Sequence, residues 1–357
     1  MRKLLFSIIV LTIVALAANI VMAFDLELYP GEIELWKKAQ KEGIVFSYDT
    51  GPTWANWKGV FEAFKDRYQL DLSWNDIGSG TTVVRLEKEK ANPQADTAYY
   101  FMPFGELAKT KNLTQPHKPN KFGEIPEKLK DPAGNWFSIH MGTVCFVVNK
   151  RLVKNSPQSW NELLKSEYKR NIVYLDPRTT GIGYAIMIAT TLTNGGDLDN
   201  LEPGAKYLGK LQEIGNVRQI EKTTPYNKFI KGEIPIWITY DFNAYRAKYT
   251  GGLGADVEII IPAEGSITAP YAISMVNDAP HPSSARLWLN FILSEEGQKI
   301  FAEGYVRPVL NVELPASVKD KFLPAKEYKK ASNVDWVKAQ EKQSEAAELW
   351  TKYVLGG

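Results

Sequence analysis

The sequence contains one cysteine and three histidines, and this scarcity excludes several kinds of site. The single Cys145 cannot form an intramolecular disulfide, so we expect it to be a small buried hydrophobic residue. His117, His140 and His281 are isolated from one another in the sequence, which favours structural roles over metal ligation. The sequence therefore predicts no metal centre, and the stability of the fold must come from burial of apolar surface.

Signatures of hydrolases and nucleotide-binding enzymes are also absent. The chain contains no G-x-S-x-G elbow, no Walker loop and no H-E-x-x-H pair. Basic and acidic side chains number 43 and 41, a balance that argues against nucleic acid as a partner. We therefore expect a protein that is not an enzyme, needs no cofactor and binds a small molecule or ion.

Long apolar runs are confined to the amino terminus, where Arg2 and Lys3 precede an apolar run from Leu4 to Val21. The residues Val21-Met22-Ala23 fit the cleavage site of a signal peptidase, and no cysteine follows that could carry a lipid. We expect residues 1–23 to be a cleaved signal peptide and the rest to be soluble outside the cytoplasm. An uncleaved anchor is the alternative, because the run approaches the ~18 residues that span a bilayer.

Strand-like apolar runs alternate with amphipathic stretches through the rest of the chain. The first strands are expected at 44–48, 70–74 and 95–101, and the helices between them at 57–68 and 81–90. This order predicts an α/β fold with mainly parallel sheets and helices on both faces. Further strands are expected at 144–149, 172–175, 235–240, 257–261 and 271–276, more than one small sheet usually holds.

Local sequence signals mark the ends of helices and the boundaries between lobes. Ser159 to Glu162 forms a capping box, and Ser294 opens a helix that Gly304 can close. A stretch rich in Pro, Lys and Asn at 109–136 and a glycine cluster at 251–254 interrupt the periodic pattern. We therefore place a first lobe at 24–140, a second lobe at 141–255, and a return to the first lobe with C-terminal helices at 256–357.

Two predicted helices begin with small residues directly after a strand. These residues are Ser79, Gly80 and Thr81 in one helix, and Thr179, Thr180 and Gly181 in the other. Free N–H groups at a helix amino terminus bind anions, and the hydroxyl groups add donors. One such opening in each lobe predicts an anionic ligand shared between the lobes. The alternative is that Ser79 and Thr180 only cap their helices.

Polar and aromatic side chains follow two other strands. They are Tyr48, Asp49, Thr50 and Trp54 after the first strand, and Tyr240 and Asp241 after the strand at 235–240. Ligands of open α/β sheets bind beyond the carboxyl ends of the strands, so we expect these side chains at the site. Asp241 is expected to accept hydrogen bonds from hydroxyl groups or to pair with an amine, and capping of the following helix is its alternative role.

These features resemble the type 2 periplasmic solute-binding proteins of ABC transporters, in the branch that binds ferric iron, polyamines and phosphorylated sugars. The most specific motifs are E-K-x-N-P-x-A-D at 89–96 and S-E-E-G-Q at 294–298, and the Gly142-Thr143 pair adds Thr143 to the candidate ligand-binding residues. The resemblance implies a two-lobed periplasmic binding protein fold, each lobe a mainly parallel sheet flanked by helices, joined by two crossover segments. It also implies a periplasmic monomer that closes over its ligand and docks on a membrane permease.

Three ligand classes remain open within this family. A ferric site would need the unusual set Tyr240, Asp241 and Tyr245, because ferric binders of the family use two adjacent tyrosines. A polyamine would use Asp49, Asp241 and aromatic walls. A phosphorylated sugar or phosphonate uses both helix openings as well as Asp241, and we prefer this class. Outside transport, a phosphatase-like enzyme and a sensory subunit that docks on a receptor are the alternatives.

Overall fold

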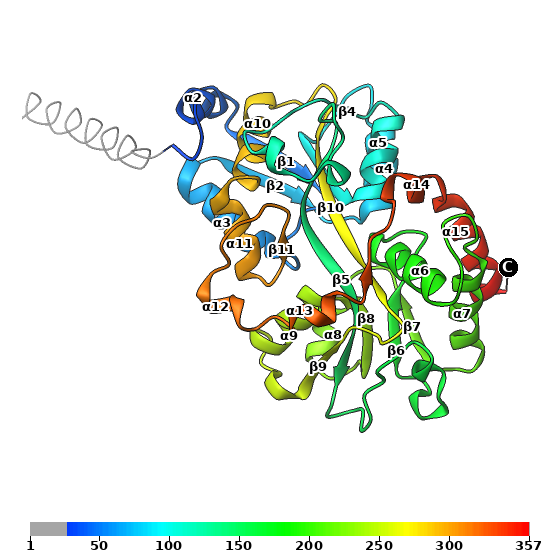
Figure 1. The fold of residues 1–357 in the computed structure, drawn as a ribbon. Helices are drawn as coiled ribbons and strands as arrows, with labels where there is room; N and C mark the ends of the chain where they lie inside the picture. The colour runs from blue at the N-terminus through cyan, green and yellow to red at the C-terminus, as the bar shows by residue number, and fades with distance from the viewer. Residues whose placement is uncertain (1–26, 357) are drawn as a thin grey trace, which may run out of the picture.

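The computed structural model describes residues 27–356, and the predicted signal peptide at 1–23 lies outside the described residues. Two lobes, drawn in the upper and lower parts of Figure 1, each contain strands covered by helices. The predicted two-lobed α/β fold is therefore confirmed. Between residues 27 and 356, no helix has both the length and the apolar character needed to span a membrane.

The first lobe is built around three parallel strands in the order β2-β1-β3. Its strands are β1 (Ile44–Tyr48), β2 (Asp71–Asn75), β3 (Thr97–Phe101) and the short β4 (Thr114–Gln115) and β11 (Arg307–Pro308). Its helices are α2 (Glu32–Glu42), α3 (Trp57–Tyr68), α4 (Ser79–Lys88), α5 (Met102–Thr110), α10 (Pro282–Ile292) and α11 (Glu295–Glu303), with turns η1 (Phe122–Glu124) and η2 (Glu127–Leu129). Strand β1 and helix α3 match their expected ranges, because each shows its apolar periodicity over its full length.

The second lobe repeats this plan with parallel strands in the order β8-β6-β7. Its strands are β6 (Ile172–Leu175), β7 (Val217–Glu221), β8 (Ile236–Tyr240) and β9 (Val257–Ile260). Its helices are α6 (Gly181–Thr193), α7 (Glu202–Glu213), α8 (Tyr226–Ile230) and α9 (Asp241–Tyr249), with turns η3 (Glu162–Leu164), η4 (Ser166–Tyr168) and η5 (Gly254–Asp256). Strand β7 was not expected from the sequence, because this edge strand exposes polar residues and lacks an apolar run.

Strands β5 (Phe137–Asn149) and β10 (Ser266–Val276) connect the two lobes. The first half of β5 pairs with β10, and from Val144 onward β5 pairs with β8 and β9. The chain thus enters the second lobe inside a continuous strand, close to the expected boundary at 140/141. Strand β9 still pairs with the second half of β5, so the return to the first lobe begins after Ile260 rather than after residue 255.

The C-terminal segment touches both lobes. It contains α12 (Ala316–Lys319), α13 (Ala325–Tyr328), β12 (Ala331–Ser332), α14 (Trp336–Glu341), α15 (Gln343–Trp350) and the π-helix η6 (Thr351–Leu355). Helix α14 packs on α5 of the first lobe, whereas α15 and η6 pack on α7 of the second lobe, at the right of Figure 1. Residues 256–357 are therefore divided between the lobes, and the last two helices cover the second.

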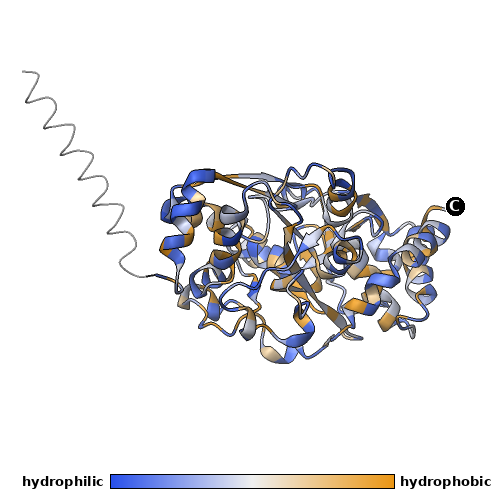
Figure 2. Ribbon diagram, turned by 90° about the horizontal axis from the view of Figure 1, so that it is seen from above, coloured by the Kyte–Doolittle hydropathy of each residue, from blue (hydrophilic) through white to orange (hydrophobic). Residues whose placement is uncertain are grey.

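Aromatic side chains fill the interior of the first lobe. Trp57 and Phe64 of α3 are buried, and their rings lie 5.9 and 4.9 Å from the ring of Trp288 in α10. Cys145 is buried in β5, as expected for an unpaired cysteine. In Figure 2 the outer helices are largely hydrophilic and the strands between them largely hydrophobic.

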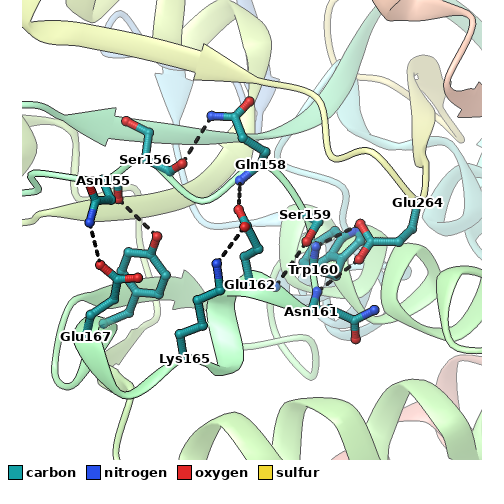
Figure 3. A network of polar contacts seen from close by, with 11 residues as sticks. Asn155, Ser156, Gln158, Ser159, Trp160, Asn161, Glu162, Lys165, Glu167 and Glu264 are labelled. Carbon is teal, nitrogen blue, oxygen red and sulfur yellow. Dashed lines mark hydrogen bonds and ion pairs between the residues drawn. The ribbon is translucent and has the colours of Figure 1, made fainter.

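Figure 3 shows the turn that precedes η3, where one of the two hydrogen bonds of the predicted capping box forms and the other is shifted to the preceding residue, Gln158. The Glu162 N–H donates to Ser159 Oγ over 3.0 Å, and the Gln158 N–H donates to the Glu162 carboxylate over 2.6 Å. The carboxylate of Glu264, in the loop before β10, accepts a hydrogen bond from the Trp160 N–H. The box opens a short 3-10 turn rather than an α-helix, and Glu264 ties the returning chain to the second lobe.

Candidate functional site

A cavity of about 340 Å³ lies between the lobes, beyond the carboxyl ends of strands from both sheets. Its size and position are those of a small-molecule site in an α/β protein. The first lobe contributes Asp49, Trp54, Asp76, Gly78 and Ser79 to its wall, and the second lobe contributes Thr180, Gly181, Lys222, Tyr240 and Arg246.

On the first wall, the carboxylate of Asp49 occupies the amino terminus of α4. The Gly78 N–H donates to Asp49 Oδ1 over 2.6 Å, and Ser79 Oγ donates to Asp49 Oδ2 over 3.2 Å. Ser79 Oγ also accepts a hydrogen bond from the Phe101 N–H over 3.0 Å. The helix opening that was expected to hold an anionic ligand therefore already holds an anion of the protein itself.

A second carboxylate, Asp76, lies beside Asp49 on the same wall. Burial raises the pKa of Asp49 well above its usual range, and the charge of Asp76 raises it further. The pKa of Asp76 is also raised, mainly because the lobes remove part of its hydration, while a hydrogen bond from Thr53 opposes the shift. Within residues 27–356, neither carboxylate is paired with a lysine or arginine. This wall therefore presents two carboxyl groups whose ionised forms are disfavoured until a positively charged group pairs with them.

On the second wall, the amino terminus of α6 is open. Thr180 caps α6, since its Oγ1 accepts a hydrogen bond from the Gly183 N–H over 3.1 Å. Gly181 and Ile182 line the cavity, and the N–H groups at the first positions of a helix have no partner inside the helix. These N–H groups and the positive end of the helix dipole favour an anion at this end of the cavity.

Two cationic side chains lie on the same wall. Arg246 of α9 places its guanidinium 4.0 Å from the ring centre of Tyr226 and donates a hydrogen bond to the carbonyl oxygen of Thr53 across the cleft. Lys222 follows β7 and is exposed at the mouth of the cavity. Within the described chain, neither cation forms an ion pair. The cavity is thus negative on the first lobe and positive on the second.

Two polar atoms in the cavity lack a partner in residues 27–356. They are Trp237 Nε1 and Thr224 Oγ1, which are buried and accept or donate no hydrogen bond. A buried polar group without a partner costs about 1–3 kcal/mol. A polar ligand in the cavity would offset that cost.

The lobes are in contact at the edges of the cavity, and Gly78 and Gly181 lie at two of these contacts. A Cβ atom at Gly181 would lie 2.6 Å from Phe101 Cβ in the opposite lobe, and one at Gly78 would lie 3.2 Å from the carbonyl oxygen of Thr179. Trp54 of the first lobe also approaches Phe242 of the second, with ring centres 6.3 Å apart. The structure is therefore a closed form of the two-lobed protein.

The structure brings together part of the predicted site. Asp49, Trp54, Ser79, Thr180, Gly181 and Tyr240 line the cavity. The remaining predictions from the strand ends and helix openings lie elsewhere. Tyr48 Oη donates to Glu89 over 2.8 Å, Thr50 Oγ1 donates to the Ser47 carbonyl over 3.3 Å, Thr81 is exposed on α4, and Gly80 and Thr179 lie in the contact between lobes.

Asp241, Thr143 and Tyr245 do not line the cavity but lie near the crossing strand. The Thr143 N–H donates to Asp241 Oδ1 over 2.8 Å, and Arg307 Nε lies 3.7 Å from Asp241 Oδ2. Tyr245 Oη lies 2.6 Å from the hydroxyl of Tyr328. Tyr240 faces the cavity instead, so the three oxygens of the alternative ferric set do not meet at one point.

Sequence reasoning missed the charged residues Asp76, Lys222 and Arg246. Asp76 directly follows β2, so the strand-end rule that identified Asp49 would have found it as well. Lys222 directly follows β7, the strand that the sequence did not reveal. Arg246 lies inside α9 and carries no recognisable sequence signal.

Comparisons with known proteins agree with the fold. A family model described as bacterial extracellular solute-binding protein matches residues 93–342. An uncharacterized protein of Haemophilus influenzae is 30% identical over 252 residues, which cover 67% of this chain and 70% of that protein. A putative 2-aminoethylphosphonate-binding periplasmic protein of Salmonella typhimurium is 28% identical over 284 residues, covering 72% of this chain and 80% of the relative. The periplasmic binding protein AfuA of Actinobacillus pleuropneumoniae superposes with a TM-score of 0.75 at 23% identity, over 88% of this chain and 98% of AfuA.

Proposed function

Because this chain belongs to the bacterial extracellular solute-binding proteins, we propose that it captures a small solute with an anionic head group for an ABC import system. Membership of the family confirms the predicted resemblance. It also confirms the prediction of a binding protein rather than an enzyme. Identification of the solute rests on the chemistry of the cavity.

The observation that carries the proposal is the opposite charge of the two cavity walls. The open amino terminus of α6, with Lys222 and Arg246, suits a phosphonate or phosphate group. Asp49 and Asp76 face it from the first lobe and suit a positively charged group. A small zwitterion with a phosphonate or phosphate at one end and an ammonium at the other satisfies both walls.

The three alternative ligand classes each leave some charged groups of the cavity without a partner. A phosphorylated sugar would satisfy the α6 end, but its hydroxyl groups would leave the charges of Asp49 and Asp76 unpaired. A polyamine would pair with those carboxylates and be repelled by Lys222 and Arg246. A hard ferric ion needs several anionic oxygens at one point, which Tyr240, Asp241 and Tyr245 do not provide. The name of the Salmonella relative, a putative 2-aminoethylphosphonate-binding protein, supports the same class of ligand, a zwitterion with a phosphonate and an ammonium group.

Location and partners follow from the same proposal. The predicted signal peptide at 1–23 would deliver the protein to the periplasm, where relatives named as periplasmic proteins act. We expect it to act as a monomer whose closed form docks on a membrane permease. The contacts that Gly78, Gly181 and Arg246 make between lobes support recognition of a closed form.

Calorimetric titration of the purified protein tests the proposed ligand class. We expect 2-aminoethylphosphonate and phosphoethanolamine to bind more tightly than fructose 6-phosphate, spermidine or ferric citrate. A ligand present at 100 times its Kd should also stabilise the fold by about 2.7 kcal/mol in thermal unfolding. Tight binding of spermidine or ferric citrate, with no response to either phosphorus compound, would refute the proposal.

A further inference from the structure

Each lobe has an aspartate that directly follows a strand and lies beside a helix opening at the cavity, and the two residues behave differently. Helix α6 is the next helix after Asp176, whereas α4 follows β2 and is reached by Asp49 only in space. Asp49 follows β1 and its carboxylate binds the amino terminus of α4. Asp176 follows β6, and its carboxylate binds Arg178, with Nη2 and Oδ2 2.7 Å apart. One helix opening is thus filled by a carboxylate of the protein, and the other is left free for a ligand.

From this difference, and resting on the proposed function, we infer that Asp49 is the residue that determines the orientation of the ligand and its selectivity. By filling the α4 opening, Asp49 converts an anion-binding wall into a cation-binding wall. The anionic end of the solute must then face α6, and its cationic end must face the first lobe. Solutes with an anion at both ends are rejected.

The backbone at Asp49 supports this role. Its φ is 58°, in the left-handed region that residues other than glycine seldom adopt, although aspartate tolerates it. This conformation accompanies the hydrogen bonds from Gly78 and Ser79 that hold the carboxylate at α4. Within residues 27–356, no basic side chain neutralises Asp49, and the neighbouring Asp76 adds charge of the same sign.

Asp176 shows what a carboxylate beside a helix opening does when its charge is compensated. The Arg178 guanidinium contacts both carboxylate oxygens, and the Arg178 N–H donates to Oδ1 over 2.9 Å. Asp176 does not line the cavity, whereas Thr180 and Gly181 after it do. A carboxylate that is paired on its own side therefore leaves the neighbouring helix opening to the solute.

The test uses two substitutions at Asp49 and two probe pairs. Asp49→Asn removes the charge at nearly unchanged shape, and Asp49→Gly empties the α4 opening at a φ that glycine adopts without strain. We expect wild type to bind 2-aminoethylphosphonate at least 30-fold more tightly than ethylphosphonate, which lacks the amine. In Asp49→Asn this ratio should fall below about threefold. Asp49→Gly should bind phosphonoacetate, which carries a second anion, at least tenfold more tightly than wild type does; tenfold corresponds to about 1.4 kcal/mol.

Asp176→Asn is the control, because it removes a carboxylate that also follows a strand beside a helix opening but is paired with Arg178 and does not line the cavity. The ratio of affinities for 2-aminoethylphosphonate and ethylphosphonate should stay as in wild type. Circular dichroism and thermal unfolding establish that each variant is folded, and Asp49→Gly serves if Asp49→Asn does not fold. If wild type discriminates between the probes and both Asp49 variants keep the same ratio, the inference is overturned. If wild type binds no phosphorus compound, the proposed function itself fails, which is a distinct result.

Discussion

The two helix openings at the cavity, α4 in the first lobe and α6 in the second, have similar local sequences and different chemistry. Each follows a strand, begins with Ser or Thr beside glycine, and directs N–H groups toward the cleft. At α4 the carboxylate of Asp49 accepts from the Gly78 N–H and the Ser79 hydroxyl, whereas at α6 Thr180 caps the Gly183 N–H and leaves those of Gly181 and Ile182 to the cavity. The comparison teaches that a helix opening binds an external anion only if the fold has not already supplied one.

The largest effect should come from blocking the approach of the lobes at α6. A Cβ at Gly181 would lie 2.6 Å from Phe101 Cβ and 3.0 Å from Tyr271 Oη, so Gly181→Val should prevent closure. We expect the affinity for 2-aminoethylphosphonate to fall more than 100-fold while the two lobes remain folded. Titration gives the affinity, and small-angle X-ray scattering with ligand gives the shape.

Gly123→Ala provides the control for that substitution, because nothing lies within 4 Å of a Cβ at this position. It should bind ligand as wild type does. Compact scattering and unchanged affinity in Gly181→Val would show that the α6 opening needs no close approach of the first lobe.

A medium effect should follow from removing a cation near the open helix. Lys222 lines the cavity at its mouth, and a hydrogen bond from a charged donor contributes about 1.5–3 kcal/mol. Because solvent reaches Lys222, we expect Lys222→Gln to weaken binding by about tenfold, or ~1.4 kcal/mol. The affinity of this variant should also depend less on salt than that of wild type.

Lys228→Gln distinguishes a local role of Lys222 from a change in overall charge. Lys228 lies in the same lobe, pairs with Glu221 over 2.7 Å and does not line the cavity. Its substitution should change the affinity by less than about twofold. Equal losses in the two variants would contradict the assignment of Lys222 to the anionic end of the ligand.

Much of the local structure around the two helix openings can be predicted from the sequence. The strands β2 and β6 and the small residues after them follow from apolar runs and from strong local helix-opening signals. Those signals also predicted that Ser79 and Thr180 lie near the ends of strands, where both line the cavity. Local patterns suffice here because each depends only on neighbouring residues.

The chemistry of the site depends on side-chain direction, which local patterns do not give. The opposite behaviour of Asp49 and Asp176 depends on a left-handed φ at one and on an arginine two residues beyond the other. Tyr240 and Asp241 are adjacent at a strand end, and neighbouring side chains there point to opposite sides, so only Tyr240 reaches the cavity. Lys222 was missed together with the polar edge strand β7 that precedes it.

The smallest effect concerns the stability of the ligand-free protein. The pKa of Asp76 is raised in the folded state, so its ionised form costs stability at neutral pH, and this cost disappears as the pH falls through the raised pKa toward the unfolded value. Asp76→Asn removes the charge, but solvent in the cavity screens it, so we expect a gain below about 1 kcal/mol or a rise in Tm of about 2 °C. Thermal unfolding at pH 7.5 and pH 4 should show the difference in Tm from wild type at the higher pH and lose it at the lower.

The same variant, Asp76→Asn, should bind 2-aminoethylphosphonate more weakly than wild type does. It should not show the gain in affinity for phosphonoacetate that is expected of Asp49→Gly, because Asp49 still fills the α4 opening. A lower Tm at pH 7.5 would mean that Asp76 is stabilised by its neighbours, and the negative wall would then not be the uncompensated partner that a cationic ligand requires.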